Sequence, residues 1–68
     1  MNIDTVTQNA QQLLAVIPYT TPNTPDEREI QKTVRCYANL NWQMVDRREN
    51  LETPEYGQFS LLQFKYEM

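Results

Sequence analysis

The stretch ANLNWQMVD, residues 38–46, decides the fold, because a predicted helix ends and a predicted strand begins within it. Asn tolerates the left-handed conformation that ends helices, second only to Gly, and the chain has a single Gly, at position 57. A helix that continued to Val45 would place Asn41 in the middle of its apolar face. We therefore predict that Asn41, or alternatively Asn39, ends the helix, and that Leu40 packs back against the last helical turns.

The residues before this stretch predict an amphipathic helix over residues 25–39. We expect Thr24 to cap the helix with its hydroxyl, Pro25 to occupy the first helical position and Glu27 to complete a capping box. Acidic side chains in the first turn suit the positive end of the helix dipole. Apolar side chains then recur at helical spacing on one side of the helix. They are Ile30, Val34, Tyr37 and Ala38, and polar residues fall on the opposite side.

A strand-like alternation overlaps the end of this helix, since every second residue from 34 to 44 is apolar. The capping box favours a helix at the start of the region. The last residue of the helix could lie several positions from the one predicted. Beyond the helix, Trp42, Met44 and Asp46 alternate with Gln43 and Val45. This alternation predicts a half-buried strand over residues 42–48.

The remaining C-terminal residues predict a loop and a second strand. Residues 49–57 lack apolar periodicity and contain Pro54, so they predict an exposed loop that ends at Gly57, a residue suited to positive φ. Residues 58–67 are rich in aromatic and apolar side chains and predict a strand. Its alternation changes register at Leu61 and Leu62, which indicates a bulge or burial on both faces. The two strands would form an antiparallel hairpin.

The N-terminal third is ambiguous between strand and helix. The apolar run at residues 13–17, followed by Pro18, favours a strand over residues 12–19 near a sheet edge. A third strand would also stabilise the hairpin, since an isolated hairpin is marginal. The apolar spacing from Ile3 to Ile17 fits a helix as well. We expect one small α+β domain over residues 1–68 in the order β-α-β-β, with residues 1–10 as a flexible or helical lead, and α-α-β-β as the alternative.

Residues 37–45 resemble a family of small uncharacterised bacterial domains. In that family a helix ends in a leucine-rich turn, and Gly-Trp-Glu-Leu-Val opens a hairpin. Here Asn41 stands in place of the Gly and Gln43 in place of the Glu. The resemblance covers about residues 27–66. It implies the fold alone, because the family carries no known activity.

Length and composition limit the classes of protein that fit this chain. A domain of 68 residues buries only about 60% of its unfolded surface. The folded monomer would therefore be marginally stable, and self-association would add stability. One cysteine and no histidine exclude an internal disulfide and the usual four-ligand zinc site. The chain begins with Met, lacks a signal-peptide pattern and has no apolar run near the ~20 residues of a membrane span. We expect a complete, cytoplasmic small protein.

No motif predicts an enzyme, a cofactor or a metal site. Cys36 and Ser60 are possible nucleophiles, but the chain has no histidine to activate them. Three carboxylates recur every three residues, at Glu49, Glu52 and Glu55. They lie in the predicted loop, where water surrounds them and no environment suited to acid–base catalysis is expected. A phosphate-binding loop needs several glycines. We therefore expect a non-enzymatic protein without a small-molecule substrate.

The favoured expectation is a small interaction or regulatory protein that contacts a protein partner or a second copy, with a homodimer as one form. One Trp, four Tyr and two Phe are many aromatics for 68 residues, and aromatic residues are enriched at interfaces. An unpaired final strand over residues 58–66 could also add to another sheet edge. We predict contacts through four side chains of the hairpin. They are Trp42, Phe59, Phe64 and Tyr66.

Nucleic-acid binding is the alternative expectation. Arg47 and Arg48 form the one adjacent basic pair, and Lys65 could join them beside the aromatic residues to hold a single strand. The formal net charge of −3 argues mildly against it, because non-specific binding relies on clustered basic side chains.

Overall fold

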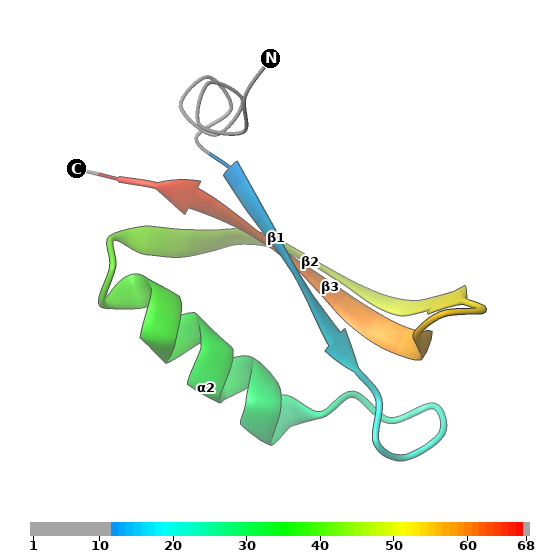
Figure 1. Ribbon diagram of the computed structural model, residues 1–68. Helices are drawn as coiled ribbons and strands as arrows, with labels where there is room; N and C mark the ends of the chain where they lie inside the picture. Colours follow the sequence, from blue (N-terminus) through cyan, green and yellow to red (C-terminus); the bar gives the residue numbers. More distant parts are fainter. Residues whose placement is uncertain (1–11, 68) are drawn as a thin grey trace.

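The computed structural model describes residues 12–67, which form one helix beside a three-stranded sheet (Figure 1). The elements follow the order β1 (Gln12–Pro18), α2 (Glu27–Ala38), β2 (Trp42–Thr53) and β3 (Gly57–Tyr66). The predicted α+β fold and its β-α-β-β order are confirmed. The alternative helix is wrong over residues 12–17, and the predicted lead over residues 1–10 lies outside the described residues. In the described part, no helix is long and apolar enough to cross a membrane.

The sheet has the order β1-β3-β2, so the last strand lies in the middle. β1 pairs antiparallel with β3 in an unbroken register, from Gln12 opposite Lys65 to Pro18 opposite Phe59. β2 pairs antiparallel with the other edge of β3. The expectation that the final strand is unpaired and available to another sheet is therefore wrong, because both of its edges are already hydrogen-bonded.

β2 is longer than predicted, and the loop after it is shorter. Residues 49–53 continue the strand, so only residues 54–56 remain between β2 and β3. Two register shifts interrupt the pairing, between Met44 and Asp46 and between Arg48 and Leu51. Each shift moves later side chains to the other face and breaks the alternation that identifies a strand in sequence. The bulge suspected at Leu61 and Leu62 lies in β2 instead, since β3 pairs with β1 without a shift.

The N-terminus of α2 is capped by Asp26 and not by Thr24. The helix begins at Glu27, and the Asp26 carboxylate accepts a hydrogen bond from the Glu29 amide at 3.2 Å. The Thr24 hydroxyl donates instead to the Pro22 carbonyl at 3.3 Å. Asp26 supplies a negative charge as well as an acceptor at the positive end of the helix dipole, which makes it the better cap.

The C-terminus of α2 involves both of the residues predicted to end the helix. The helix ends at Ala38 with Asn39 as its C-cap, and Asn41 in the following turn adopts a left-handed φ of 70°. The Asn41 carbonyl then accepts a hydrogen bond from the Glu67 amide at 2.8 Å, which ties the turn to the end of β3. Leu40 is 58% exposed. The expectation that Leu40 packs back on the helix is therefore wrong.

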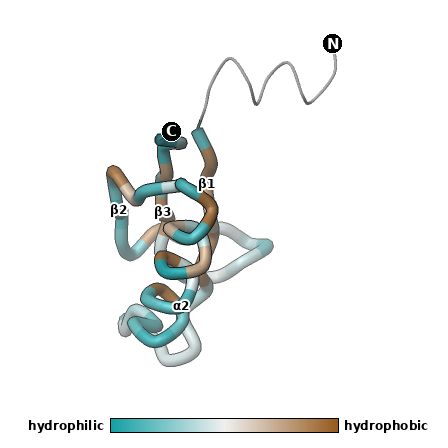
Figure 2. Tube along the Cα trace, turned by 90° about the vertical axis from the view of Figure 1, so that its left-hand side faces the viewer, coloured by the Kyte–Doolittle hydropathy of each residue, from teal (hydrophilic) through white to brown (hydrophobic). Residues whose placement is uncertain are grey.

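α2 covers one face of the sheet and forms the core with it (Figure 2). The central buried residues are Ile17, Ile30, Leu62 and Phe64. Side chains alternate between the two faces of a strand, so the residues next to these in β1 and β3 point to the opposite face. Within residues 12–67, no helix or strand covers that side, which we call the open face. Its apolar members are Leu14, Val16, Pro18, Leu51, Phe59 and Leu61.

Candidate functional site

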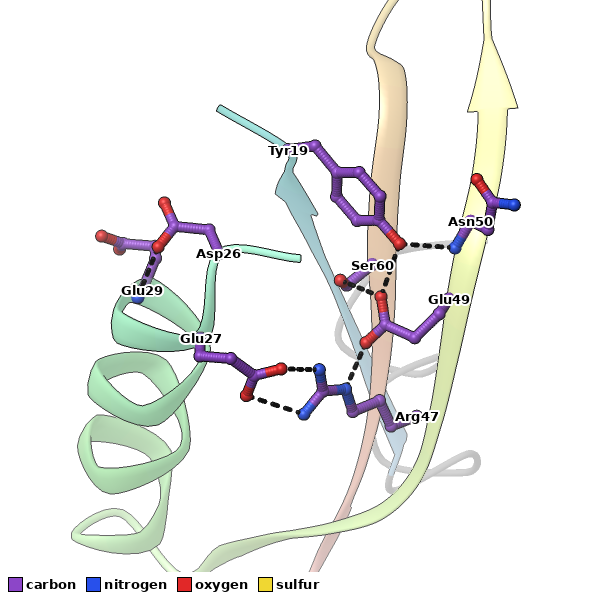
Figure 3. A network of polar contacts seen from close by, with 8 residues as sticks. All are labelled: Tyr19, Asp26, Glu27, Glu29, Arg47, Glu49, Asn50 and Ser60. Carbon is purple, nitrogen blue, oxygen red and sulfur yellow. Dashed lines mark hydrogen bonds and ion pairs between the residues drawn. The ribbon is translucent and has the colours of Figure 1, made fainter. Parts of the chain in front are cut away.

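Arg47 on β2 is the centre of a polar network between the sheet and α2 (Figure 3). Its Nη1 donates to Oε1 of Glu27 at 3.1 Å, and Nη2 donates to the other oxygen of the same carboxylate. Its Nε donates to Glu49. This is the two-pronged geometry in which a guanidinium binds carboxylates most specifically. One side chain therefore holds a carboxylate of the helix and a carboxylate of its own strand.

Glu49 extends the network to the other two strands. Its carboxylate accepts a hydrogen bond from the Tyr19 hydroxyl at 2.8 Å and another from Ser60 Oγ. The Tyr19 oxygen in turn accepts from the Asn50 amide at 2.8 Å. Ser60 is fully buried, and Glu49 satisfies its hydroxyl. Glu49 thus joins the end of β1, the middle of β2 and the middle of β3 on the face that α2 covers.

The network sets the protonation state of its own groups. Partial burial raises the pKa of Glu49, but hydrogen bonds from Ser60, Arg47 and Tyr19 outweigh it and leave the pKa below its ordinary value. The hydrogen bond from Arg47 lowers the pKa of Glu27. Loss of hydration and the hydrogen bond to Glu49 raise the pKa of Tyr19. At neutral pH both carboxylates are therefore ionised around one guanidinium, beside a neutral phenol.

This arrangement joins α2 to the sheet and encloses the one serine hydroxyl of the network. Ser60 is inaccessible, and its hydroxyl hydrogen is committed to Glu49. The prediction that Glu49 lies in a solvated loop is wrong, because it lies half-buried within β2. Glu52 also lies in β2 and not in a loop, and both Glu52 and Glu55 are exposed, as expected of solvated side chains. The sequence signal that could have found the network is the spacing of Arg47 and Glu49, since opposite charges at i and i+2 lie on one face of a strand.

The structure separates the three candidate nucleic-acid contacts. Arg47 faces α2 and is bound by two carboxylates. Arg48 and Lys65 belong to the open face, where Arg48 is opposite Leu61 and pairs with Asp46 at 3.3 Å. Leu61 and Lys65 are four positions apart on β3, about 13 Å along the strand. The three cations therefore do not form one patch, and Arg47 and Arg48 are each neutralised by acidic neighbours.

Two of the four predicted interface residues are buried inside the chain. Phe64 is 0% exposed and Phe59 is 7% exposed, so neither offers a surface to a partner. Trp42 and Tyr66 are half-buried and pack edge to face, with ring centroids 5.3 Å apart. Similar edge-to-face pairs join Tyr37 to Phe64 and Tyr56 to Phe59. The aromatic side chains mostly contact one another, which explains how so small a chain contains so many.

The open face is the apolar surface that sequence reasoning missed. Leu14 is 61% exposed in β1, and Tyr56 is 52% exposed where it packs on Phe59. Val16 and Leu61 lie between them, opposite each other in the register of β1 and β3 and half-buried. The apolar residues therefore run across the face toward the outer edge of β1. No single motif marks this surface, because it depends on which side of the sheet α2 occupies.

The remaining candidate sites are the cysteine and a possible metal site. Cys36 is a free, exposed cysteine on α2. Among residues 12–67, no group of three His, Cys, Asp or Glu side chains is placed to hold a metal ion.

Comparison of the chain with protein-family models, with curated proteins and with solved structures finds no match. The resemblance of residues 37–45 to the small bacterial domains therefore stays a prediction. The function must be argued from the surface of the molecule itself.

Proposed function

We propose that this chain is a non-enzymatic protein that works by self-association, with the open face and the adjoining strand β1 as its contact surface. The observation that carries the proposal is the uncovered apolar side of the sheet, on which Leu14 is 61% exposed and Tyr56 is 52% exposed. Contiguous exposed apolar surface on a small protein commonly marks a site of protein contact. Of the four interface residues expected from sequence, Phe59 belongs to the open face but is 7% exposed, and the proposed contact relies on its more exposed neighbours instead.

The small size of the core supports the same proposal. Among residues 12–67, five hydrophobic residues expose less than a tenth of their surface. Domains this small commonly need a further source of stability, and the chain has no second cysteine for a disulfide. A second copy beside β1 would bury apolar side chains at the adjoining margin of the open face, such as Leu14. The alternative of nucleic-acid binding draws no comparable support, because Arg47 and Arg48 are paired with carboxylates.

Sedimentation equilibrium over a concentration series tests the proposal. We expect the wild-type protein to shift from one copy to two as its concentration rises. Leu14→Lys places a charge on the open face and should weaken the association by about tenfold or more. Leu40→Lys is the matched control, since Leu40 is 58% exposed but lies in the turn after α2. A wild-type protein that stays a single copy at every concentration would contradict the proposal.

A further inference from the structure

We propose that β1 pairs antiparallel with β1 of a second copy, with Leu14 opposite Val16 of the second copy. The two three-stranded sheets would then join into one continuous sheet about a twofold axis. This inference rests on the proposed self-association and specifies the edge, the direction and the register of the contact.

The backbone of β1 has one hydrogen-bonded edge and one outer edge. The Tyr19 amide donates to the Gln58 carbonyl at 2.9 Å. That bond continues the register of β1 with β3, which has no shift. Backbone groups of an antiparallel strand point alternately to either side, so odd-numbered residues of β1 bond to β3. The amides and carbonyls of Leu14 and Val16 therefore point to the outer edge, and the side chains of the same residues lie on the open face.

The two edges of the sheet differ in how they are protected. β1 carries no charged side chain between Gln12 and Pro18. The outer strand at the other edge, β2, carries many charges and is interrupted by two register shifts. Charges, bulges and prolines are devices that keep edge strands from pairing with other chains. β1 has no charge and no register shift with β3, and its one proline, Pro18, is its last residue, so β1 is the edge at which a second strand can add. The charged residues of β2 include Asp46, Arg47, Arg48, Glu49 and Glu52.

β1 also fits a copy of itself. A twofold contact places the same patch on both sides, and an uncharged strand meets no like charge there. With Leu14 opposite Val16 of the second copy, Ala15 lies on the axis, where its small side chain leaves room. Pro18 lies opposite Gln12 of the second copy, at the end of the paired strands. The amide hydrogen that Pro18 lacks therefore removes a hydrogen bond only at that end. The contact is about 23 Å long, and we expect it to dissociate on dilution, as small interfaces do.

Cysteine cross-linking tests the register. In a Cys36→Ser background, Ala15→Cys should form a disulfide with its own counterpart under mild oxidation. Non-hydrogen-bonded residues that face each other lie about 4.5 Å apart at Cα, which is within reach of a disulfide. Leu13→Cys is the matched control on the same strand and face. In the proposed register the two Leu13 positions are about 13 Å apart, and we expect no cross-link.

The outcomes separate this inference from the proposed function. A wild-type protein that is always a single copy would overturn both. A dimer that forms no Ala15→Cys cross-link, or one that cross-links through Leu13→Cys instead, would overturn the β1 register and leave self-association standing. If Ala15→Cys disturbs folding, as judged by its circular dichroism, Leu14→Lys decides the edge. A dimer that survives Leu14→Lys unchanged overturns pairing through β1.

Discussion

Arg47 of β2 binds Glu27 in the first turn of α2 through both of its Nη atoms, with Nη1 3.1 Å from Glu27 Oε1. The two residues are 20 positions apart in sequence. The contact therefore fixes the N-terminal end of the helix against the sheet. At the other end of the helix, the Asn41 carbonyl accepts from the Glu67 amide. The helix is thus held at both ends by polar contacts, and the apolar core lies between them.

Arg47→Lys should lower the free energy of unfolding by about 1 kcal/mol, after allowance for the partial exposure of the contact. A lysine ammonium is a single point charge and cannot bind Glu27 and Glu49 together as a guanidinium does. Urea unfolding followed by Trp42 fluorescence measures the change. Arg48→Lys is the control, because its pair with Asp46 is exposed. Equal effects of the two substitutions would contradict the role given to Arg47.

Acid should destabilise the wild-type protein more than Glu49→Gln. The hydrogen bonds of the network hold the folded pKa of Glu49 below its ordinary value. A carboxylate with a lowered folded pKa stabilises the protein above the unfolded pKa, about 4.3, and this contribution is lost as the pH falls through the folded pKa. The wild-type melting temperature should therefore fall more steeply below about pH 5.

Thermal melts of both proteins from neutral to acidic pH check this expectation. Glu49→Gln should melt lower at neutral pH, because it loses the charge that faces Arg47. Its melting temperature should then change less on acidification. Glu52→Gln is the control, since Glu52 is exposed. Parallel pH curves for wild type and Glu49→Gln would show that Glu49 does not titrate with folding.

Asp26→Ala should cost about 1 kcal/mol of stability, the usual loss for a helix cap. Thr24→Ala should change stability by less than about 0.5 kcal/mol, because an exposed substitution away from a cap is nearly neutral. The two residues are the observed and the sequence-predicted cap of the same helix. Urea unfolding of both variants compares them directly. A larger loss for Thr24→Ala would mean that the cap predicted from sequence operates in solution.

Asn41→Ala should destabilise the protein by about 1 kcal/mol, because Ala lacks the short polar side chain that lets Asn adopt the left-handed region. Asn41→Gly should keep or improve stability, because Gly adopts this conformation freely. Asn39→Ala is the control, as Asn39 has a helical φ of −65°. Chemical unfolding of the three variants gives the order of their free energies of unfolding. If Asn39→Ala costs as much as Asn41→Ala, the helix end has been assigned to the wrong residue.

Much of the fold could be predicted from local sequence. Thr24 to Glu27 and the apolar spacing after it located α2, and Asn41 marked its end. The alternation after Trp42 and the aromatic residues near the C-terminus located the hairpin. These signals are local, because caps, turns and side-chain periodicity act over a few residues. The antiparallel hairpin was expected with a loop over residues 49–57, and the structure shortens that connection to residues 54–56.

The polar network and the open face could not be predicted in the same way. Two register shifts break the side-chain alternation in the second half of β2, so the sequence predicted a loop around Glu49. In the structure Ser60 and Tyr19 donate hydrogen bonds to Glu49. The partners of Glu49 lie 11 and 30 residues away in sequence. The middle position of β3 depends on β1 crossing to its free side. Contacts of this kind are set by topology, and the one local sign, the spacing of Arg47 and Glu49, says nothing of the distant partners.

Hydrogen exchange of the Leu14 and Val16 amides, measured by NMR at several protein concentrations, tests the central claim most directly. In a single copy these amides point away from β3 and should exchange quickly, while the Ala15 amide is protected by β3. Pairing of β1 with a second copy predicts that Leu14 and Val16 become protected as the concentration rises, together with the increase in mass. Fast exchange of both amides in a sample that is dimeric by mass would contradict the account.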